Sequence, residues 1–265
     1  VLFEAMRYSV FAGGKRLRPI LFLATIEAVG ENSEEMLSFA CALELIHTYS
    51  LIHDDLPAMD NDDFRRGLLT CHKKYGEAQA ILAGDSLLTY AFNLMLKVRE
   101  NSIVPERLLE AIDEVALGAG IRGMIVGQVV DIEAENKEIS LDELKFIHRH
   151  KTGALFCAAM RSGAILAGAK KPQLEALTEY AEQFGLAFQI TDDILDVIGD
   201  EEKLGKPIGS DVKNHKSTYP ALIGLEKAKI QAEEAVERAI QSLKNFNSDA
   251  DPLREMAKLI IAREN

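Results

Sequence analysis

Five aspartates crowd one short stretch of this 265-residue sequence, HDDLPAMDNDDFRRG, and two arginines follow them at once. On a regular helix Asp54 and Asp60 would lie about 120° apart, too far round the axis to share an ion. Pro57 stands between them, and a proline disrupts the helical turn before it. We therefore expect a helix to run to about Asp55 and then to bend, so that Asp60 swings back toward Asp54.

A second acidic cluster, in QITDDILDV, lies more than a hundred residues downstream. Asp192 and Asp196 are four residues apart and share one face of a helix, with Asp193 beside them. A solvated acidic face is the ordinary fate of such clusters. Here Ile190 and Ile194 crowd the same turns, so we expect the carboxylates to point into a cleft.

Two facing carboxylate clusters would need cations between them. Oxygen ligands without His or Cys beside them favour Mg²⁺, which usually shares its coordination sphere with substrate phosphates. A calcium loop does not fit, because Arg65 and Cys71 stand where a loop counted from Asp60 needs Gly and Glu.

Basic side chains lie in the sequence near glycines and near the first acidic cluster. The formal net charge of the whole chain is nevertheless -12, which argues against a nucleic-acid binder. GGKRLRP offers flexible backbone N–H groups followed by three cations, a plausible grip for an anion. Direct contact through cations and indirect contact through Mg²⁺ together suggest two phosphorylated substrates. The candidate side chains are Lys15, Arg16, Arg18, Arg65, Arg66, Lys151, Thr152, Lys206 and Lys216.

Helical signals recur along the chain and strand signals do not. Ser140 with Glu143, and Asn32 with Glu35, are spaced as capping boxes. Four prolines stand where a first helical turn would begin, and long Ala- and Leu-rich segments carry apolar residues at three- and four-residue spacing. We predict an all-α fold of around eight to ten helices in one domain, residues 1–265. The four prolines are Pro105, Pro172, Pro220 and Pro252.

Cysteine usage and hydropathy bear on location. Cys41, Cys71 and Cys157 are odd in number and lack metal spacing, which fits a reducing compartment. Because Arg122 interrupts the most apolar stretch, we expect no membrane span and a cytoplasmic protein. Since the chain opens on Val1, we also expect a short N-terminal segment to precede it.

Five motifs resemble, in order and spacing, those of the trans-isoprenyl diphosphate synthases, also called polyprenyl synthetases: GGKRLRP, LIHDDLPAMDNDDFRRG, HKTGAL, FQITDDILDV and KSTYPAL. The resemblance runs over nearly the whole chain. It implies a single-domain helical bundle around a central active-site cavity, usually a homodimer. It also implies a Mg²⁺-dependent prenyltransferase of isoprenoid biosynthesis that joins isopentenyl diphosphate head to tail to an allylic diphosphate (dimethylallyl or geranyl).

The resemblance also assigns roles to individual positions. The metal ligands, for three Mg²⁺ ions, would be Asp54, Asp55, Asp60, Asp192, Asp193 and Asp196, of which Asp54, Asp60 and Asp192 match most firmly. Isopentenyl diphosphate would be held by Gly14, Lys15, Arg18, His47 and Arg66, and the allylic substrate by Arg65, Lys151, Thr152, Gln189, Lys206 and Lys216. His47 also shares a helical face with Asp54, seven residues on.

Product length is expected to depend on Tyr49 and its neighbour Ser50. Tyr49 lies five residues before Asp54, roughly 7.5 Å farther down a helix. Its ring would close the pocket that receives the growing hydrocarbon, and an aromatic at this place accompanies a fifteen-carbon product in similar family members. We therefore expect farnesyl diphosphate, with geranylgeranyl or geranyl diphosphate as the alternative products.

Other functions remain as alternatives. A terpene cyclase shares the fold but normally carries an Asn/Ser/Glu-type second metal motif, where this chain has a second DDxxD. An HD-type metal phosphohydrolase could use His53, Asp54 and Asp55, yet it would leave the basic clamps unexplained. A non-catalytic synthase subunit would have lost some aspartates, and none is lost here.

Overall fold

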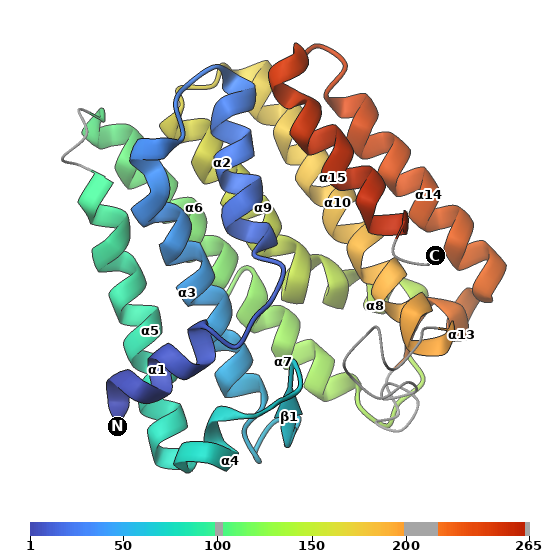
Figure 1. Ribbon diagram of the computed structural model, residues 1–265. Helices are drawn as coiled ribbons and strands as arrows, with labels where there is room; N and C mark the ends of the chain where they lie inside the picture. Colours follow the sequence, from blue (N-terminus) through green and yellow to red (C-terminus); the bar gives the residue numbers. More distant parts are fainter. Residues whose placement is uncertain (99–102, 199–216, 263–265) are drawn as a thin grey trace. The chain divides into compact units, whose positions relative to one another are not determined.

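A computed structural model describes residues 1–98, 103–198 and 217–262, so Lys206 and Lys216 lie outside the described residues (Figure 1). Apart from one two-stranded hairpin, the regular elements of the described ranges are helices, which confirms the predicted all-α class. The chain divides into two compact units, residues 1–20 with 34–105, and residues 21–33 with 106–265. The single domain expected from the sequence stays a prediction.

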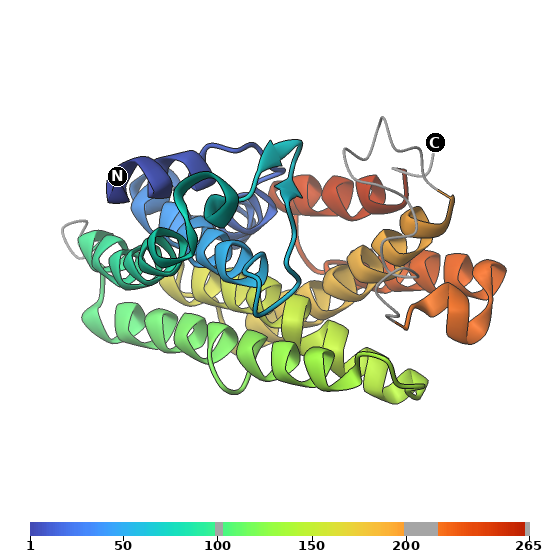
Figure 2. The same ribbon diagram turned by 90° about the horizontal axis from the view of Figure 1, so that it is seen from below.

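The first unit is built on two long antiparallel-running helices, α3 and α5, which lie side by side (Figures 1 and 2). Small buried residues of α5, Ala80, Ala83 and Gly84, allow close packing. The hairpin pairs Phe64 with Leu69. The elements are α1 (Leu2–Val10), a 3₁₀ turn (Glu34–Met36), α3 (Leu37–Asp54), β1 (Phe64–Arg65), β2 (Leu68–Leu69), α4 (Cys71–Tyr75) and α5 (Glu77–Lys97).

In the second unit α10 is the central helix, with α9 and α14 packed against it (Figure 1). Its buried Tyr180 hydroxyl donates to the Leu253 carbonyl of α15, 2.6 Å away. The elements are the larger part of α2 (Leu17–Val29), α6 (Pro105–Ala119), α7 (Met124–Ala134), α8 (Leu141–Ile147), a π-helix (His148–Gly153), α9 (Ala154–Leu166), α10 (Lys171–Ile198), α13 (Tyr219–Ile223), α14 (Leu225–Ser242), a 3₁₀ turn (Ser248–Ala250) and α15 (Asp251–Ile261).

Local helix signals were accurate where they depend on neighbouring residues. All four prolines lie at the first or second position of a helix, namely α6, α10, α13 and α15. Ser140 and Glu143 form the expected reciprocal capping box at the start of α8. The described ranges hold thirteen α-helices, more than expected, because α4 and α13 are very short and a π-helix divides α8 from α9.

The charge of Arg122 does not by itself exclude a membrane span. By length and composition the stretch Pro105–Ala134 contains an 18-residue window that is apolar enough to cross a membrane. In the structure the stretch is two helices, α6 and α7, joined by a turn over residues 120–123. Such a segment is weak evidence for a membrane span.

Candidate active site

The first acidic motif lies at a bend that follows α3. The helix ends at Asp54, and the backbone N–H of Asp60 donates to the Asp54 carbonyl over 2.9 Å. Asn61 then takes a left-handed backbone conformation with φ of 53°. The chain therefore turns back on itself, and the predicted return of Asp60 toward Asp54 is confirmed.

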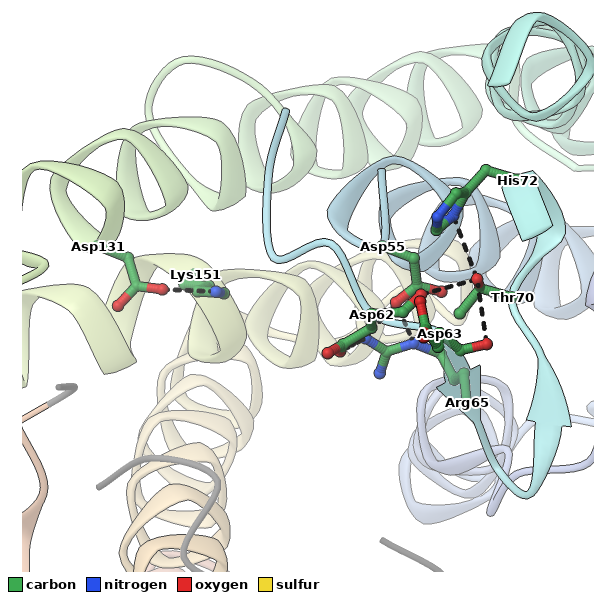
Figure 3. Close-up of polar contacts among 8 residues, drawn as sticks. All are labelled: Asp55, Asp62, Asp63, Arg65, Thr70, His72, Asp131 and Lys151. Carbon is green, nitrogen blue, oxygen red and sulfur yellow. Dashed lines mark hydrogen bonds and ion pairs between the residues drawn. The ribbon is translucent and has the colours of Figure 1, made fainter. Parts of the chain in front are cut away.

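Asp55, between these two, is bound by the protein itself (Figure 3). Its Oδ1 accepts a hydrogen bond of 2.6 Å from Nε of Arg65 on β1, within an ion pair, and its side chain is nearly inaccessible. Burial raises the Asp55 pKa to about 6, against the lowering effect of Arg65. Thr70 fixes the same hairpin, because its hydroxyl donates to the Asp62 carbonyl over 2.8 Å. Asp55 thus holds Arg65 in place, and its assignment as a metal ligand stays a prediction.

The Arg66 guanidinium fills the place where a side chain at position 14 would lie, so Gly14 leaves the room for it. Gly14 has a φ of 113°, and a Cβ there would lie 2.4 Å from the Arg66 guanidinium. The same guanidinium donates to the carbonyl of Gly13, and Arg66 itself takes a φ of 54°. Non-glycine residues in this conformation are costly and cluster at functional sites, so the loop and Arg66 are held in a strained arrangement.

Arg16 has a structural role. Its guanidinium donates to Oε1 of the buried Glu44 and to the Gly13 carbonyl, each over 2.6 Å. It also reaches the carbonyl of Val10 at the end of α1. Glu44, which the sequence did not single out, therefore anchors the glycine loop to α3.

His47 is surrounded by positive charge. Its pKa is lowered well below the usual value, first by burial and then by four arginines, Arg18, Arg66, Arg65 and Arg16. The Arg18 pKa is itself lowered to about 10, mainly by burial. Two buried carboxylates offset part of this charge, Glu44 beside Arg16 and Asp55 beside Arg65, so the four guanidinium groups outnumber the buried carboxylates next to them. A neutral imidazole among arginines is suited to an anionic ligand.

In the second unit Lys151 lies in the π-helix His148–Gly153. Its Nζ contacts Oδ2 of Asp131 on α7 over 2.6 Å (Figure 3). The two helices approach closely because Gly127 has no side chain. A Cβ at Gly127 would lie 2.1 Å from the backbone nitrogen of Lys151. Asp131 was missed, although Gly127 four residues before it marks the same helical face. Thr152, in the same π-helix, is partly buried.

The second acidic motif lies on the regular helix α10 together with Gln189. Asp192 is partly exposed, whereas Asp193 and Asp196 are buried. Oδ2 of Asp193 accepts a 2.9 Å hydrogen bond from the backbone N–H of Tyr219. The imidazole of His148 stacks on the Tyr219 ring, and burial lowers the His148 pKa to about 4. Because Asp54 and Asp192 belong to different units, their predicted meeting in one cavity stays a prediction.

Both expected chain-length residues lie in α3. Tyr49 is buried, with 6% of its surface exposed. The Ser50 hydroxyl donates to the His47 carbonyl over 2.8 Å, which ties it to its own helix.

The donor set fits magnesium. Among the described residues, no group of three His, Cys, Asp or Glu side chains is arranged to hold a metal ion. Mg²⁺ usually binds through one or two carboxylates and completes its sphere with water and substrate phosphate. Asp54 with Asp60, at a bend that brings their backbones together, supplies two carboxylates of this kind.

Comparison with known proteins identifies the family. The model of the polyprenyl synthetase family matches residues 1–259. The chain belongs to this family. It is 51% identical over 262 residues to a farnesyl diphosphate synthase of Geobacillus stearothermophilus, covering 99% of this chain and 88% of that protein. A geranylgeranyl diphosphate synthase of Cyanophora paradoxa is 50% identical over 265 residues, covering 100% and 88%. Among solved structures, a geranyltransferase of Helicobacter pylori complexed with magnesium and isoprenyl diphosphate has a TM-score of 0.86 and 36% identity, covering 98% and 87%.

Proposed function

We propose that this chain is a prenyltransferase that condenses isopentenyl diphosphate head to tail with dimethylallyl and geranyl diphosphates and releases farnesyl diphosphate. The relatives support the reaction class, since farnesyl diphosphate synthases are about half identical over nearly the whole chain. The observation that carries the proposal is the cluster of four arginines around His47, in the same unit as the first acidic motif. Because four arginines outnumber the two buried carboxylates beside them, the cluster favours a bound anion.

Two sets of residues divide the substrates in this proposal. Gly14, Lys15, Arg18, His47 and Arg66 hold isopentenyl diphosphate, because the glycine loop supplies backbone N–H groups and the arginines fixed charge. Arg65, Lys151, Thr152 and Gln189 face the allylic substrate. Lys206 and Lys216 share that role by resemblance alone.

Asp54, Asp60 and Asp192 would hold Mg²⁺, with three ions in the site. The bound ions would neutralise diphosphate charge and so favour departure of that group. The magnesium in the Helicobacter pylori relative supports the same choice of metal.

The chemistry breaks the allylic C–O bond and forms one C–C bond. Arg65 stabilises the departing diphosphate with a charge that Asp55 orients. Thr152, Gln189 and the Lys151 carbonyl present dipoles to the allylic cation without a strong nucleophile. The isopentenyl double bond attacks, and the released diphosphate accepts the proton that leaves, since none of these side chains is placed as a base.

A direct assay tests this reaction. The protein is incubated with isopentenyl diphosphate and each allylic diphosphate, with and without Mg²⁺, and the products are sized. We expect a fifteen-carbon diphosphate only when the metal is present. Free alcohol or phosphate without a new carbon–carbon bond would instead indicate a hydrolase.

Tyr49 is the proposed floor of the product pocket. Its buried ring lies on α3 five residues before Asp54, where the growing hydrocarbon would meet it. Tyr49→Ala should shift the product from fifteen toward twenty carbons. An unchanged product length would remove Tyr49 from this role and leave the geranylgeranyl synthases among the relatives as the better guide.

We also propose a homodimer that works in the cytoplasm, in keeping with three free thiols. Large apolar side chains of α6 and the following turn are exposed, with Leu109 at 66% and Ile121 at 81%. A second copy of the chain would cover them. Ile121→Glu should lower the mass measured by light scattering to that of a monomer, whereas Leu259→Glu, also on an exposed apolar residue, should leave it unchanged.

A further inference from the structure

The imidazole of His53 fills a space between α3 and α5 that only a glycine leaves open. Its Nε2 lies 3.1 Å from the carbonyl oxygen of Ile81, to which it donates. The ring lies over Gly84, where a Cβ would be 2.2 Å from Nε2. Oδ1 of Asp85 is 3.9 Å from the same nitrogen. Gly84 therefore sets where this ring can be, and the Ile81 carbonyl sets its orientation.

The other side of the imidazole meets Tyr49. The two rings make an edge-to-face contact, with centroids 5.8 Å apart and planes at 82°. Tyr49 stands one helical turn before His53 and is buried. In a densely packed interior a side chain moves by changing rotamer, and it can do so only where a neighbour leaves room. The imidazole of His53 occupies the room on the side of Tyr49 where it also meets Gly84 of α5.

We propose that His53, placed by Gly84, is a positioning residue for product length: it holds the Tyr49 ring across the product pocket. The proposal rests on the proposed role of Tyr49 as the pocket floor. A growing hydrocarbon would press on the Tyr49 ring, and the ring could yield by turning into the space that the imidazole fills beside Gly84. Without the imidazole the tyrosine ring gains a second position, and the pocket deepens.

The ratio of twenty- to fifteen-carbon product tests this role. It does not depend on how much of a variant folds, so a loss of stability alone leaves it unchanged. His53→Ala should raise the ratio roughly two- to tenfold, the factor expected for loss of one aromatic contact. His53→Asn keeps an N–H for the Ile81 carbonyl but has no ring, and it should raise the ratio similarly.

A double variant tests the part played by Gly84. If Gly84 acts only by leaving room for the imidazole, Gly84→Ala combined with His53→Ala should give the same ratio as His53→Ala alone. A ratio for the double variant that departs from this value would overturn the placement by Gly84.

The matched control is His72→Ala. His72 is a buried histidine of the same unit whose ring contacts Thr70, 3.1 Å away, so the ratio should stay at the value of the unaltered protein. If Tyr49→Ala lengthens the product while both His53 variants leave the ratio unchanged, the proposal is overturned and the floor survives. If Tyr49→Ala leaves the length unchanged, the floor itself fails and the role of His53 falls with it.

Discussion

The two aspartate-rich motifs have the same spacing of their first two carboxylates but different backbones beneath them. Asp54 and Asp55 stand at the end of α3, and a bend brings Asp60 back. Asp192, Asp193 and Asp196 stand on unbroken turns of α10. In both motifs the second aspartate is buried and bound by the protein, Asp55 by Arg65 and Asp193 by the Tyr219 N–H. The comparison suggests a division of labour, in which the first aspartate binds metal and the second fixes its surroundings.

The largest effects are expected at the first aspartates. Asp54→Ala and Asp192→Ala should each lower kcat by about a hundredfold or more, because each removes a charge that the proposed metal ions need. Circular dichroism should show that both variants stay folded. Near-normal turnover of either variant would contradict the proposal that the first aspartate of each motif binds metal.

The next largest effect is expected at Asp55. Asp55→Ala leaves the partly buried Arg65 without its main partner and should lower the free energy of unfolding by about 2–4 kcal/mol, measured with urea. Replacing both partners, as in Asp55→Leu with Arg65→Met, should recover much of this loss, since burial already disfavours the charged carboxylate. A double variant as unstable as Asp55→Ala would show that the carboxylate has another structural partner.

A smaller effect should distinguish the two roles at Asp193. Asp193→Asn keeps an oxygen that can accept from the Tyr219 N–H, so kcat should fall less than about tenfold. Asp193→Ala leaves that buried N–H unsatisfied and should cost about 1–3 kcal/mol of stability. If Asp193→Asn instead lowers turnover as far as Asp192→Ala does, Asp193 is a metal ligand and the division of labour is wrong.

Sequence reasoning was strongest where structure follows from neighbouring residues. Pro57 marked the bend after α3, and the capping box at Ser140 and the first-turn prolines marked helix starts. These features depend on a hydrogen bond made or lost within a few residues, so the local chain determines them.

Features that depend on a distant segment were not predictable in this way. The ion pair of Lys151 with Asp131 joins residues twenty positions apart, and the collision that forbids a side chain at Gly14 involves Arg66. The roles that the resemblance assigns to the site residues concern bound substrates and metal ions, and these roles stay predictions. Glycines that tolerate no Cβ, such as Gly84 and Gly127, have meaning only once their partners are known.

The π-helix at His148–Gly153 has a consequence for the register of the chain. A π turn holds about one residue more than an α turn, so it rotates everything that follows by roughly 100° relative to an uninterrupted helix. Deleting a single residue from this segment would restore regular winding and leave each side chain of α9 on its present face, because the loss of one position and the return to α geometry rotate the helix by similar amounts in opposite directions. A homologous sequence that is one residue shorter here would therefore present the same side chains of α9 to its neighbours, with a regular turn in place of the π turn.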